Sequence, residues 1–310
     1  AHAADLDGDG DMDILSASVF DDKIAWYENT DGLGTFGAQQ VITASAHWAI
    51  GVKTADLDND GDQDVIALSG SWADNKITWF ENTDGLGSFG PEKLITKRIN
   101  GALSIFAADL DGDGDKDILS ASVFDNKVAW YENTDGLGTF GPQQIITTLT
   151  QGASYVSASD VDEDGDKDVL SASRNDDKVI FYENTDGLGS FSKGNILTTT
   201  ADEAGYVVAK DLDGDGDLDV LAASCDFKIA WQKNTLPLRI IKDPEDVAIL
   251  PKEETSFQIE AFDANAFQWQ VNSGSGFVNL NNDTVYVGVE NDTLKILEAV
   301  YDMTGNKYRC

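Results

Sequence analysis

The sequence has few histidine, cysteine and basic residues. It holds two His and two Cys among 310 residues, and 21 Lys and Arg against 56 Asp and Glu, a formal charge of −35. Such a charge repels nucleic acid and anionic lipid, so we expect no function on DNA, RNA or a membrane surface. His2 and His47 have no partner that can be identified in the sequence, and no Ser-His-Asp arrangement is evident. We therefore expect no enzyme.

The two cysteines and the apolar residues are also informative through what they do not form. Cys225 and Cys310 fall in different predicted domains, and neither has a Cys or His at zinc-ligand spacing, so we expect neither a disulfide nor a zinc site. No run of about 18 apolar residues predicts a membrane span, and no signal peptide is visible. Because residues 1–10 already lie inside a repeat, we expect the N-terminus to be cut or processed from a longer chain.

A repeat of about 50 residues dominates the chain. Acidic segments of one pattern, such as DLDGDGDMD, begin at Asp5, Asp56, Asp109, Asp160 and Asp211. Around each segment lie four short strand-like runs separated by turn residues, in the same order each time. Four strands per unit at this period predict the blades of an all-β propeller.

Aromatic residues recur at two fixed places in the repeat. They are Trp26, Trp79, Trp130, Phe181 and Trp231 in the third strand, and Phe36, Phe89, Phe140 and Phe191 before the fourth. One interpretation is a platform for stacking sugars. We favour packing between neighbouring blades, because a residue needed by every blade belongs to the core.

The acidic segments have the form D-x-D-x-D-G-x-x-D, which predicts a calcium loop. Alternate carboxylates can converge on one ion, Gly at position 6 permits a sharp turn, and hard oxygen ligands suit Ca²⁺. An EF-hand needs Glu at position 12. Here position 12 is Ser or Ala within an apolar run, so position 9 must close the site and the loop must join two strands.

These segments resemble FG-GAP (VCBS-type) repeats, the family of the integrin α-subunit propeller and of many bacterial secreted proteins. The resemblance covers residues 1–235 and implies about five Ca²⁺ ions, one per repeat. It makes positions 1, 3, 5 and 9 side-chain ligands and position 7 a carbonyl ligand. By number these are Asp5, Asp7, Asp9, Asp13 and Asp11; Asp56, Asp58, Asp60, Asp64 and Asp62; Asp109, Asp111, Asp113, Asp117 and Asp115; Asp160, Asp162, Asp164, Asp168 and Asp166; and Asp211, Asp213, Asp215, Asp219 and Asp217.

The resemblance also bears on location and on blade number. Extracellular calcium modules bind at about 10⁻⁴–10⁻³ M, which argues for a secreted or surface location. The first repeat lacks most of its first strand and the fifth lacks its fourth. The family suggests seven blades in the intact protein, closed by an upstream strand that pairs with the last blade; a five-bladed ring is the alternative.

Residues 236–310 have a different composition and no acidic loop. Trp269, Tyr308 and Cys310 resemble the strand C tryptophan and the tyrosine corner of an immunoglobulin-like sandwich. The partner cysteine expected on strand B is absent. We predict a truncated Ig-like domain, similar to modules of large secreted bacterial proteins.

The connections between strands 4 and 1, and between strands 2 and 3, vary among repeats. In the resembling propellers they share the face opposite the calcium loops and carry ligand contacts. Binding candidates are Trp48, Trp72, Arg98, Tyr155, Arg174 and Tyr206. We expect a non-catalytic binding or adhesion module for a glycan or an extracellular protein. The alternatives are a lyase-like polysaccharide-degrading enzyme and a passive spacer.

Overall fold

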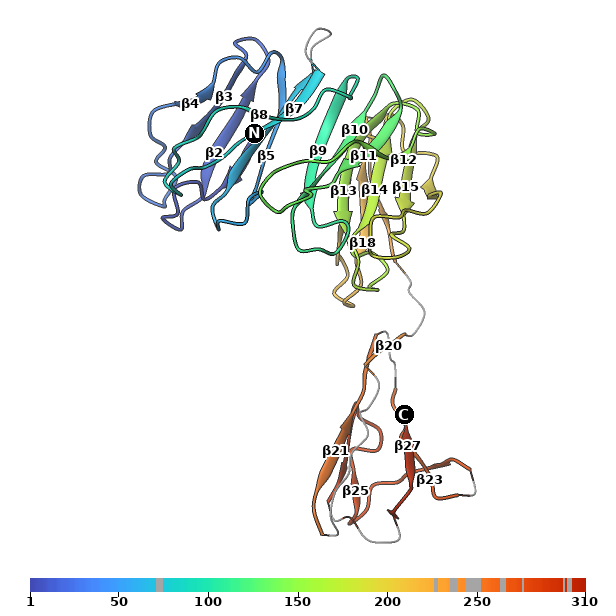
Figure 1. Cartoon of the computed structure of the whole chain (residues 1–310). Coiled ribbons are helices and arrows are strands. Elements are labelled where there is room, and N and C mark those ends of the chain that lie inside the picture. The colour runs from blue at the N-terminus through green and yellow to red at the C-terminus, as the bar shows by residue number, and fades with distance from the viewer. Residues whose placement is uncertain are drawn as a thin grey trace. The chain divides into compact units, whose positions relative to one another are not determined.

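A computed structural model describes residues 1–70, 75–225, 228–234, 239–242, 252–262, 266–274, 276–297, 299 and 303–310. This part of the chain is built from β-strands and contains no α-helix (Figure 1). The chain divides into two compact units. The first comprises residues 1–212 and 217–234, and the second comprises residues 213–216 and 235–310.

The first unit contains a row of antiparallel sheets, one per repeat, which we call blades 1 to 5. Blade 1 has strands β1 (His2–Ala4), β2 (Asp13–Ser18), β3 (Lys23–Tyr27) and β4 (Gln40–Thr43). Blade 2 has β5 (Ala49–Ala55), β6 (Asp64–Gly70), β7 (Asn75–Phe80) and β8 (Lys93–Thr96). Blade 3 has β9 (Ala102–Ala108), β10 (Asp117–Ser122), β11 (Lys127–Tyr131) and β12 (Gln144–Thr147). Blade 4 has β13 (Ala153–Ser159), β14 (Asp168–Ser173), β15 (Lys178–Tyr182) and β16 (Asn195–Thr198). Blade 5 has β17 (Tyr206–Lys210), β18 (Asp219–Ala223) and β19 (Ile229–Gln232).

The blade order confirms the predicted repeat. Each sheet follows the chain order, and the first strands of successive blades contact one another from β1 through β5, β9 and β13 to β17. β1 is short, as the sequence predicts. Blade 5 has three described strands, and residues 235–238, where the sequence predicts the loss of the fourth, lie outside the described residues. The described strands show no closed ring, so seven blades stays a prediction.

Alternation along each second strand places a core on both sides of a blade. In β6, Val65 and Ala67 belong to the apolar cluster shared with blade 1, whereas Ile66 and Leu68 belong to the cluster shared with blade 3. All four side chains are buried. The hydrophobic core of the first unit therefore lies between blades, where sheet packs on sheet.

The recurring tryptophans belong to these interblade cores. Trp26, Trp79 and Trp130 are buried. Their rings lie against Gly87, Gly138 and Gly189 of the next blade, where an added Cβ would stand 2.3, 2.1 and 2.3 Å from a ring carbon. These contacts confirm the predicted interblade packing for the three tryptophans. The same prediction is wrong for Trp231, which is 52% exposed because no described blade packs on the far side of blade 5.

An asparagine also ties each blade to the one before it. The Asn82 side-chain amide donates to the Leu6 carbonyl at 2.8 Å. The same bond recurs from Asn133 to Leu57, from Asn184 to Leu110 and from Asn234 to Val161, at 2.8, 2.9 and 2.8 Å. The acceptor is always position 2 of the preceding acidic loop, so the loop of one blade is anchored by the next.

The second unit is also built from short antiparallel strands. They are β20 (Arg239–Lys242), β21 (Thr255–Gln258), β22 (Glu260–Phe262), β23 (Gln270–Asn272), β24 (Val278–Asn279), β25 (Tyr286–Val287), β26 (Thr293–Ile296) and β27 (Lys307–Arg309). They form sheets β20-β22, β21-β26-β25 and β24-β23-β27. Trp269 is fully buried, and Phe257, Tyr308 and Cys310 pack around its cluster. The Ig-like assignment stays a prediction.

The structure also describes the surroundings of the cysteines and the histidines. Cys225 and Cys310 are both free thiols. Over the described residues, no helical segment has the length and apolar character needed to cross a membrane. Both histidines have polar neighbours that could not be identified from the sequence: His2 Nε2 lies 3.1 Å from Thr54 Oγ1, and His47 Nδ1 lies 2.9 Å from Asp22 Oδ2.

Candidate functional site

Each acidic loop joins the first strand of a blade to the second. Gly at position 6 has positive φ in all five loops, +93° at Gly10 and +104° at Gly165 for example. L side chains avoid this backbone region, whereas Gly enters it freely. The sharp turn predicted at position 6 is therefore present in every repeat.

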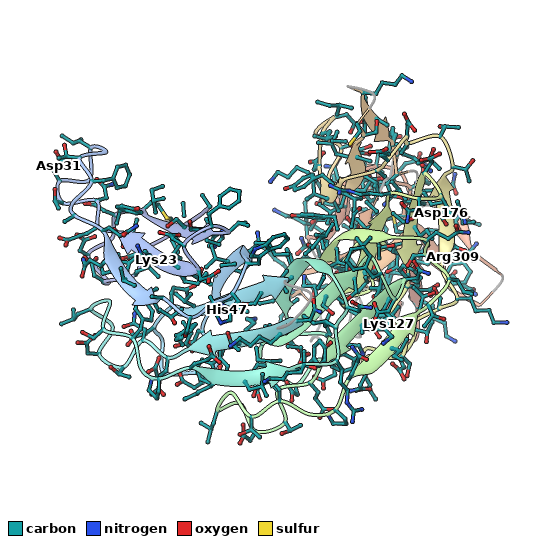
Figure 2. All side chains as sticks on the ribbon, turned by 90° about the horizontal axis from the view of Figure 1, so that it is seen from above. Lys23, Asp31, His47, Lys127, Asp176 and Arg309 are labelled. Carbon is teal, nitrogen blue, oxygen red and sulfur yellow. The ribbon has the colours of Figure 1, made fainter. Side chains whose placement is uncertain are left out.

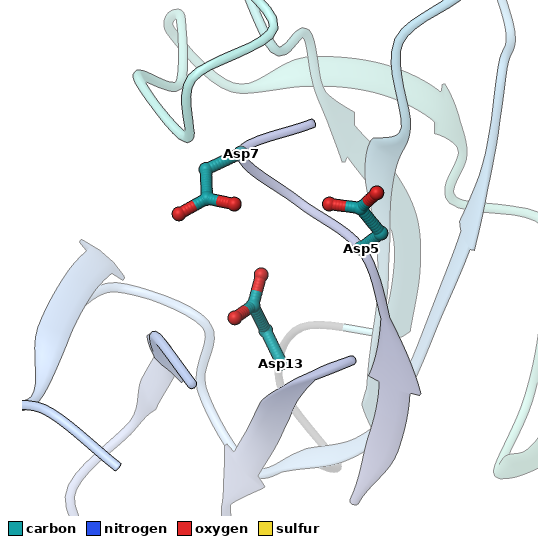
Figure 3. A group of neighbouring side chains, drawn as sticks. All are labelled: Asp5, Asp7 and Asp13. Atoms are coloured by element: carbon teal, nitrogen blue, oxygen red, sulfur yellow. The ribbon is translucent and has the colours of Figure 1, made fainter. Parts of the chain in front are cut away.

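Three carboxylates converge in each loop, from positions 1, 3 and 9. In the first loop these are Asp5, Asp7 and Asp13 (Figure 3). The corresponding groups are Asp56, Asp58 and Asp64; Asp109, Asp111 and Asp117; Asp160, Asp162 and Asp168; and Asp211, Asp213 and Asp219. One oxygen from each member lies within 4.8 Å of the others. Two oxygens on opposite sides of a Ca²⁺ ion are about 4.6–5.2 Å apart, so one ion can reach all three.

Position 9 is fixed by the backbone of its own blade. Asp64 is fully buried. Its Oδ2 accepts from the Leu57 amide at 3.0 Å, and its Oδ1 accepts from the Asn82 amide at 2.8 Å. The other four loops repeat this pair of bonds. The carboxylate at position 9 therefore joins the acidic loop to the turn after the third strand.

Several oxygens of the clusters are buried without a hydrogen-bond partner. They include Asp56 Oδ1, Asp58 Oδ1 and Asp160 Oδ1. A buried acceptor without a partner costs about 1–3 kcal/mol, and more when the group is charged. A cation bound between these oxygens would satisfy them, so the residues present fit a hard divalent ion.

The electrostatics of the clusters point the same way. Burial raises the pKa of Asp64 and Asp117 to about 7 and that of Asp168 to about 6, although backbone amides oppose the shift. Burial, and then neighbouring carboxylates, raise the pKa of Asp58 and Asp111. The clusters thus disfavour their own ionised form, and a bound cation would reverse that preference.

Positions 5 and 7 make other contacts. Asp9 Oδ1 accepts from the Asp11 amide at 2.9 Å, and the carboxylate of Asp9 is outside the group of three. The Asp11 side chain lies over Gly32 of the following turn, where a Cβ would stand 2.5 Å from its oxygens. The ligand roles predicted for the position 5 side chain and the position 7 carbonyl stay predictions.

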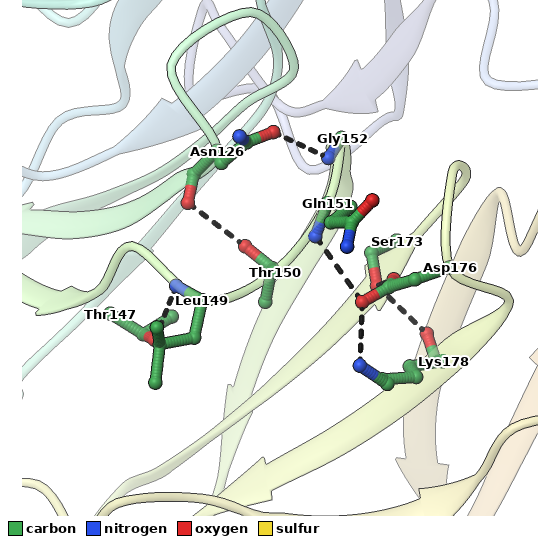
Figure 4. Close-up of polar contacts among 9 residues, drawn as sticks. All are labelled: Asn126, Thr147, Leu149, Thr150, Gln151, Gly152, Ser173, Asp176 and Lys178. Atoms are coloured by element: carbon green, nitrogen blue, oxygen red, sulfur yellow. Dashed lines mark hydrogen bonds and ion pairs between the residues drawn. The ribbon is translucent and has the colours of Figure 1, made fainter.

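The variable connections lie at the opposite ends of the strands from the acidic loops, because adjacent strands in a blade are antiparallel. In each of the first four blades an Asp or Asn at the start of the third strand, or just before it, accepts a hydrogen bond from a backbone amide of the next strand 4–1 connection. Asn126 Oδ1 accepts from the Gly152 amide at 2.8 Å, and the Asn126 carbonyl accepts from Thr150 Oγ1 at 3.1 Å (Figure 4). The Gln151 amide donates to Asp176 Oδ2 at 3.3 Å.

Trp48 occupies an unusual backbone position in the first of these connections. Its φ is +51°, and its amide donates to Asp22 Oδ1 at 3.0 Å. The equivalent residues in the next two connections are Gly101 and Gly152, with φ of +62° and +70°. The left-handed region costs an L residue about 1–2 kcal/mol. Trp48 is 48% exposed, so about half of its surface is accessible to a ligand.

Of the other binding candidates, Arg98 and Arg174 lie on the variable connections, whereas Tyr155 lies in β13 and Tyr206 begins β17. Arg98, Arg174 and Tyr206 are exposed, and Tyr155 is half-buried. The structure brings Tyr155 and Tyr206 together, with ring centroids 4.3 Å apart. Trp72 lies outside the described residues. His47 and Asp176, which also lie on these connections, are labelled in Figure 2.

Sequence reasoning missed the residues that join one blade to the next. The motif ENTDGLG, as at residues 81–87, has the composition of a turn, yet its Asn82 bonds to the preceding acidic loop and its Gly87 lies against the ring of Trp26 in the preceding blade. Asn59, at position 4, likewise donates to Asp115 Oδ1 of the next blade at 2.7 Å. The Asn and the second Gly of this motif recur in the repeats, which indicates a structural role. Recurrence does not show which blade a residue contacts.

Among the solved structures that resemble this chain, a lectin supports the fold. An Agrocybe aegerita lectin that recognises non-reducing terminal N-acetylglucosamine is 22% identical, with a TM-score of 0.53. The alignment covers 71% of this chain and 59% of that chain, so this chain spans less than two thirds of the lectin's length. BBS1N, solved in complex with ARL6DN, is 13% identical with a TM-score of 0.47, over 96% of this chain and 91% of that one. A functionally unknown protein from Desulfotomaculum acetoxidans is 13% identical with a TM-score of 0.46, over 71% and 65% of the two chains.

A search of curated proteins finds no match. The model of the FG-GAP-like repeat matches residues 5–67, 63–120, 119–171 and 160–222, which together span well over half of the chain. The matched segments contain the five acidic loops and every strand of blades 2 to 4, and the chain therefore belongs to the FG-GAP-like repeat family.

Proposed function

We propose that the five carboxylate clusters bind one Ca²⁺ ion each. The observation that carries this proposal is the set of buried, unpartnered carboxylate oxygens inside the clusters, such as Asp56 Oδ1 and Asp58 Oδ1. Asp at positions 1, 3 and 9 would hold the ion, with positions 5 and 7 completing the shell. Oxygen donors in this number suit Ca²⁺ better than Mg²⁺, which keeps more water.

Bound calcium would stabilise the blades rather than take part in chemistry. The ion would link the end of the first strand to the start of the second and would neutralise carboxylates that now repel one another. At a hundredfold excess of free Ca²⁺ over Kd, one site adds about 2.7 kcal/mol to the free energy of unfolding. The scaffold would therefore be stable only where calcium is abundant, in keeping with an extracellular or cell-surface location.

On this scaffold, the face opposite the acidic loops binds a glycan or an extracellular protein. Trp48 supports this best, because it has a positive φ of +51° and about half of its surface is exposed. Strain of this kind concentrates at functional sites. The likeness to a lectin is a likeness of fold, and it makes N-acetylglucosamine a reasonable first probe.

The family also motivates the wider architecture that we propose. The intact propeller would have seven blades, and residues 236–310 would form an Ig-like domain. Trp269 and Tyr308 support the latter, since β23 pairs with β27 and both residues contribute to one apolar cluster. The protein would then be a secreted or surface-bound adhesion or binding module.

The binding proposal can be tested with Trp48→Gly in saturating CaCl₂. We expect wild type to bind members of a glycan array that includes N-acetylglucosamine, with indole fluorescence changing on binding, and we expect Trp48→Gly to lose both signals. Leu149→Gly is the control, because Leu149 is exposed on another connection of the same face. Equal binding by Trp48→Gly would refute the role of Trp48. Absence of any ligand would favour a spacer, and cleavage of a polysaccharide would favour an enzyme.

A further inference from the structure

The asparagine that joins neighbouring blades also contacts a predicted calcium ligand. The Asn184 backbone amide donates to Asp168 Oδ1 at 2.9 Å. Its side-chain amide donates to the Leu110 carbonyl of the preceding blade, also at 2.9 Å. Leu110 lies between Asp109 and Asp111, two members of the third carboxylate cluster. One residue therefore holds the acidic loops of two blades at once.

The same double contact recurs at the other junctions between blades. In each case the asparagine backbone amide donates to the position 9 carboxylate of its own blade. The pairs are Asn82 and Asp64, Asn133 and Asp117, and Asn234 and Asp219, at 2.8, 2.9 and 2.9 Å. Position 9 also accepts from the position 2 amide of its own loop, and the position 2 carbonyl accepts from the next asparagine, as at Val161. These bonds form one chain that runs from the first acidic loop to the fifth.

The asparagines of the inner junctions are removed from water. Asn82, Asn133 and Asn184 are 1%, 0% and 1% exposed. A buried amide that loses its acceptor has no water to replace it and bears the full cost of its desolvation. The side-chain bond is therefore made only when the loop of one blade and the turn of the next are both in place. It ties the ordered state of one loop to that of its neighbour.

We propose that these asparagines couple neighbouring calcium sites, so that Ca²⁺ bound in one acidic loop raises the affinity of the loop in the next blade. This coupling presupposes the calcium sites of the proposed function. An ion that orders the third loop would fix the Leu110 carbonyl, and the bond to Asn184 would then hold the amide that positions Asp168. The fourth site would pay less of its own ordering cost. Because coupling is reciprocal, an ion in the fourth site would favour the third by the same factor.

One junction has a second bond between its loops. Asn59, at position 4 of the second loop, donates to Asp115 Oδ1 at 2.7 Å and to the Gly136 carbonyl at 3.1 Å. Position 4 is Gly8 in the first loop and Gly112 in the third, and glycine has no side chain to make this bond. The third and fourth sites therefore isolate the contribution of the asparagine.

Two substitutions, made singly and together, test the coupling of these two sites. Asp111→Asn removes a carboxylate from the third cluster and keeps the oxygen that accepts from the Asp113 amide at 3.3 Å. Asn184→Ala removes the bond to Leu110 and keeps the backbone amide that donates to Asp168. Asn184 is thus treated as a positioning residue, and no ligand of the fourth site is altered.

Hydrogen exchange read by mass spectrometry reports on each loop separately. The full chain is titrated with CaCl₂ in about 0.15 M NaCl, where charges more than about 8 Å apart are largely screened. The midpoint of protection for residues 160–168 measures the fourth site. We expect Asp111→Asn to raise this midpoint about fivefold or more in the wild-type background. In the Asn184→Ala background, Asp111→Asn should leave it unchanged.

A matched control separates the bond from other effects of substitution in this turn. Thr185→Ala removes a hydroxyl that donates to the Ser190 carbonyl at 2.9 Å within the same blade. Asp111→Asn should shift the midpoint in this background as it does in wild type. The change in charge is the same in every background, so a difference between backgrounds measures the bond. Asp7→Asn with Asn82→Ala, read on residues 56–64, is the equivalent cycle should Asn184→Ala fail to fold.

The outcomes distinguish the coupling from the calcium sites themselves. If both loops gain protection with CaCl₂ but Asp111→Asn leaves the fourth midpoint unchanged, the coupling is wrong and the sites stand. A shift that persists in Asn184→Ala would equally overturn the role of the asparagine. If no acidic loop gains protection at any CaCl₂ concentration, the proposed function is refuted and the coupling with it.

Discussion

Adding one methyl group at equivalent glycines should separate interblade packing from backbone strain. Gly138 and Gly34 occupy the same place in their repeats and share positive φ, +78° and +92°. Ala at either position pays about 1–2 kcal/mol for the left-handed region. At Gly138 the new Cβ would also stand 2.1 Å from Trp79, whereas Gly34 has nothing within 4 Å. Overpacking of a buried site adds about 1–3 kcal/mol. Gly138→Ala should therefore lower the free energy of unfolding by about 1–3 kcal/mol more than Gly34→Ala.

Thermal unfolding followed by circular dichroism would measure the difference. For a unit of this size, 1–3 kcal/mol lowers the melting temperature by about 2–12 °C. The comparison belongs in saturating CaCl₂. Equal melting temperatures for the two variants would refute the packing of Trp79 on Gly138.

Three further predictions concern the interblade bond, the clusters and the binding face. Asn133→Ala should lower the free energy of unfolding by about 1–3 kcal/mol more than Asn29→Ala. Of the two, only Asn133 bonds to a preceding acidic loop, and its loss leaves a buried carbonyl oxygen without a partner. Urea unfolding measures both free energies, and equal losses would count against the bond. In EDTA the melting temperature should fall as pH rises from about 5 to about 8. Burial raises the pKa of Asp64 and Asp117 from 3.8 in the unfolded chain to about 7 in the folded chain, so the protonated carboxyls stabilise the fold at low pH and this stabilisation is lost as pH rises through about 7. A melting temperature that stays flat or rises with pH would contradict this, and CaCl₂ should reverse the trend. Trp48→Gly should raise the melting temperature by about 2–8 °C through relief of about 1–2 kcal/mol of strain, and a lower value would show that the indole packs.

The sequence predicts the blades well because their signals are local. Strand alternation, turn residues and the acidic loop each lie within a few residues, and they recur. Asp64 and its relatives at position 9 could be assigned from spacing alone. The structure adds that both oxygens of Asp64 are held by backbone amides, one of them on a turn 18 residues away.

Contacts between repeats could not be predicted in the same way. Asn82 bonds to Leu6, 76 residues earlier, and nothing in the motif ENTDG indicates the direction of that bond. Trp231 and Trp79 occupy the same position in their repeats, yet Trp231 is exposed and Trp79 is buried. The burial of this tryptophan depends on whether another blade packs on its own, which the position in the repeat does not reveal. The strain at Trp48 is a backbone property, visible only once its equivalents are known to be Gly101, Gly152 and Glu203, all with positive φ.

Calcium titration with a count of bound ions tests the central claim most directly. Isothermal titration calorimetry of the EDTA-stripped chain should give about five ions per molecule, one per cluster, and CaCl₂ should raise the melting temperature strongly over EDTA. A chain that binds no calcium, and melts at the same temperature in both solutions, would contradict the account and leave the acidic loops as solvated turns.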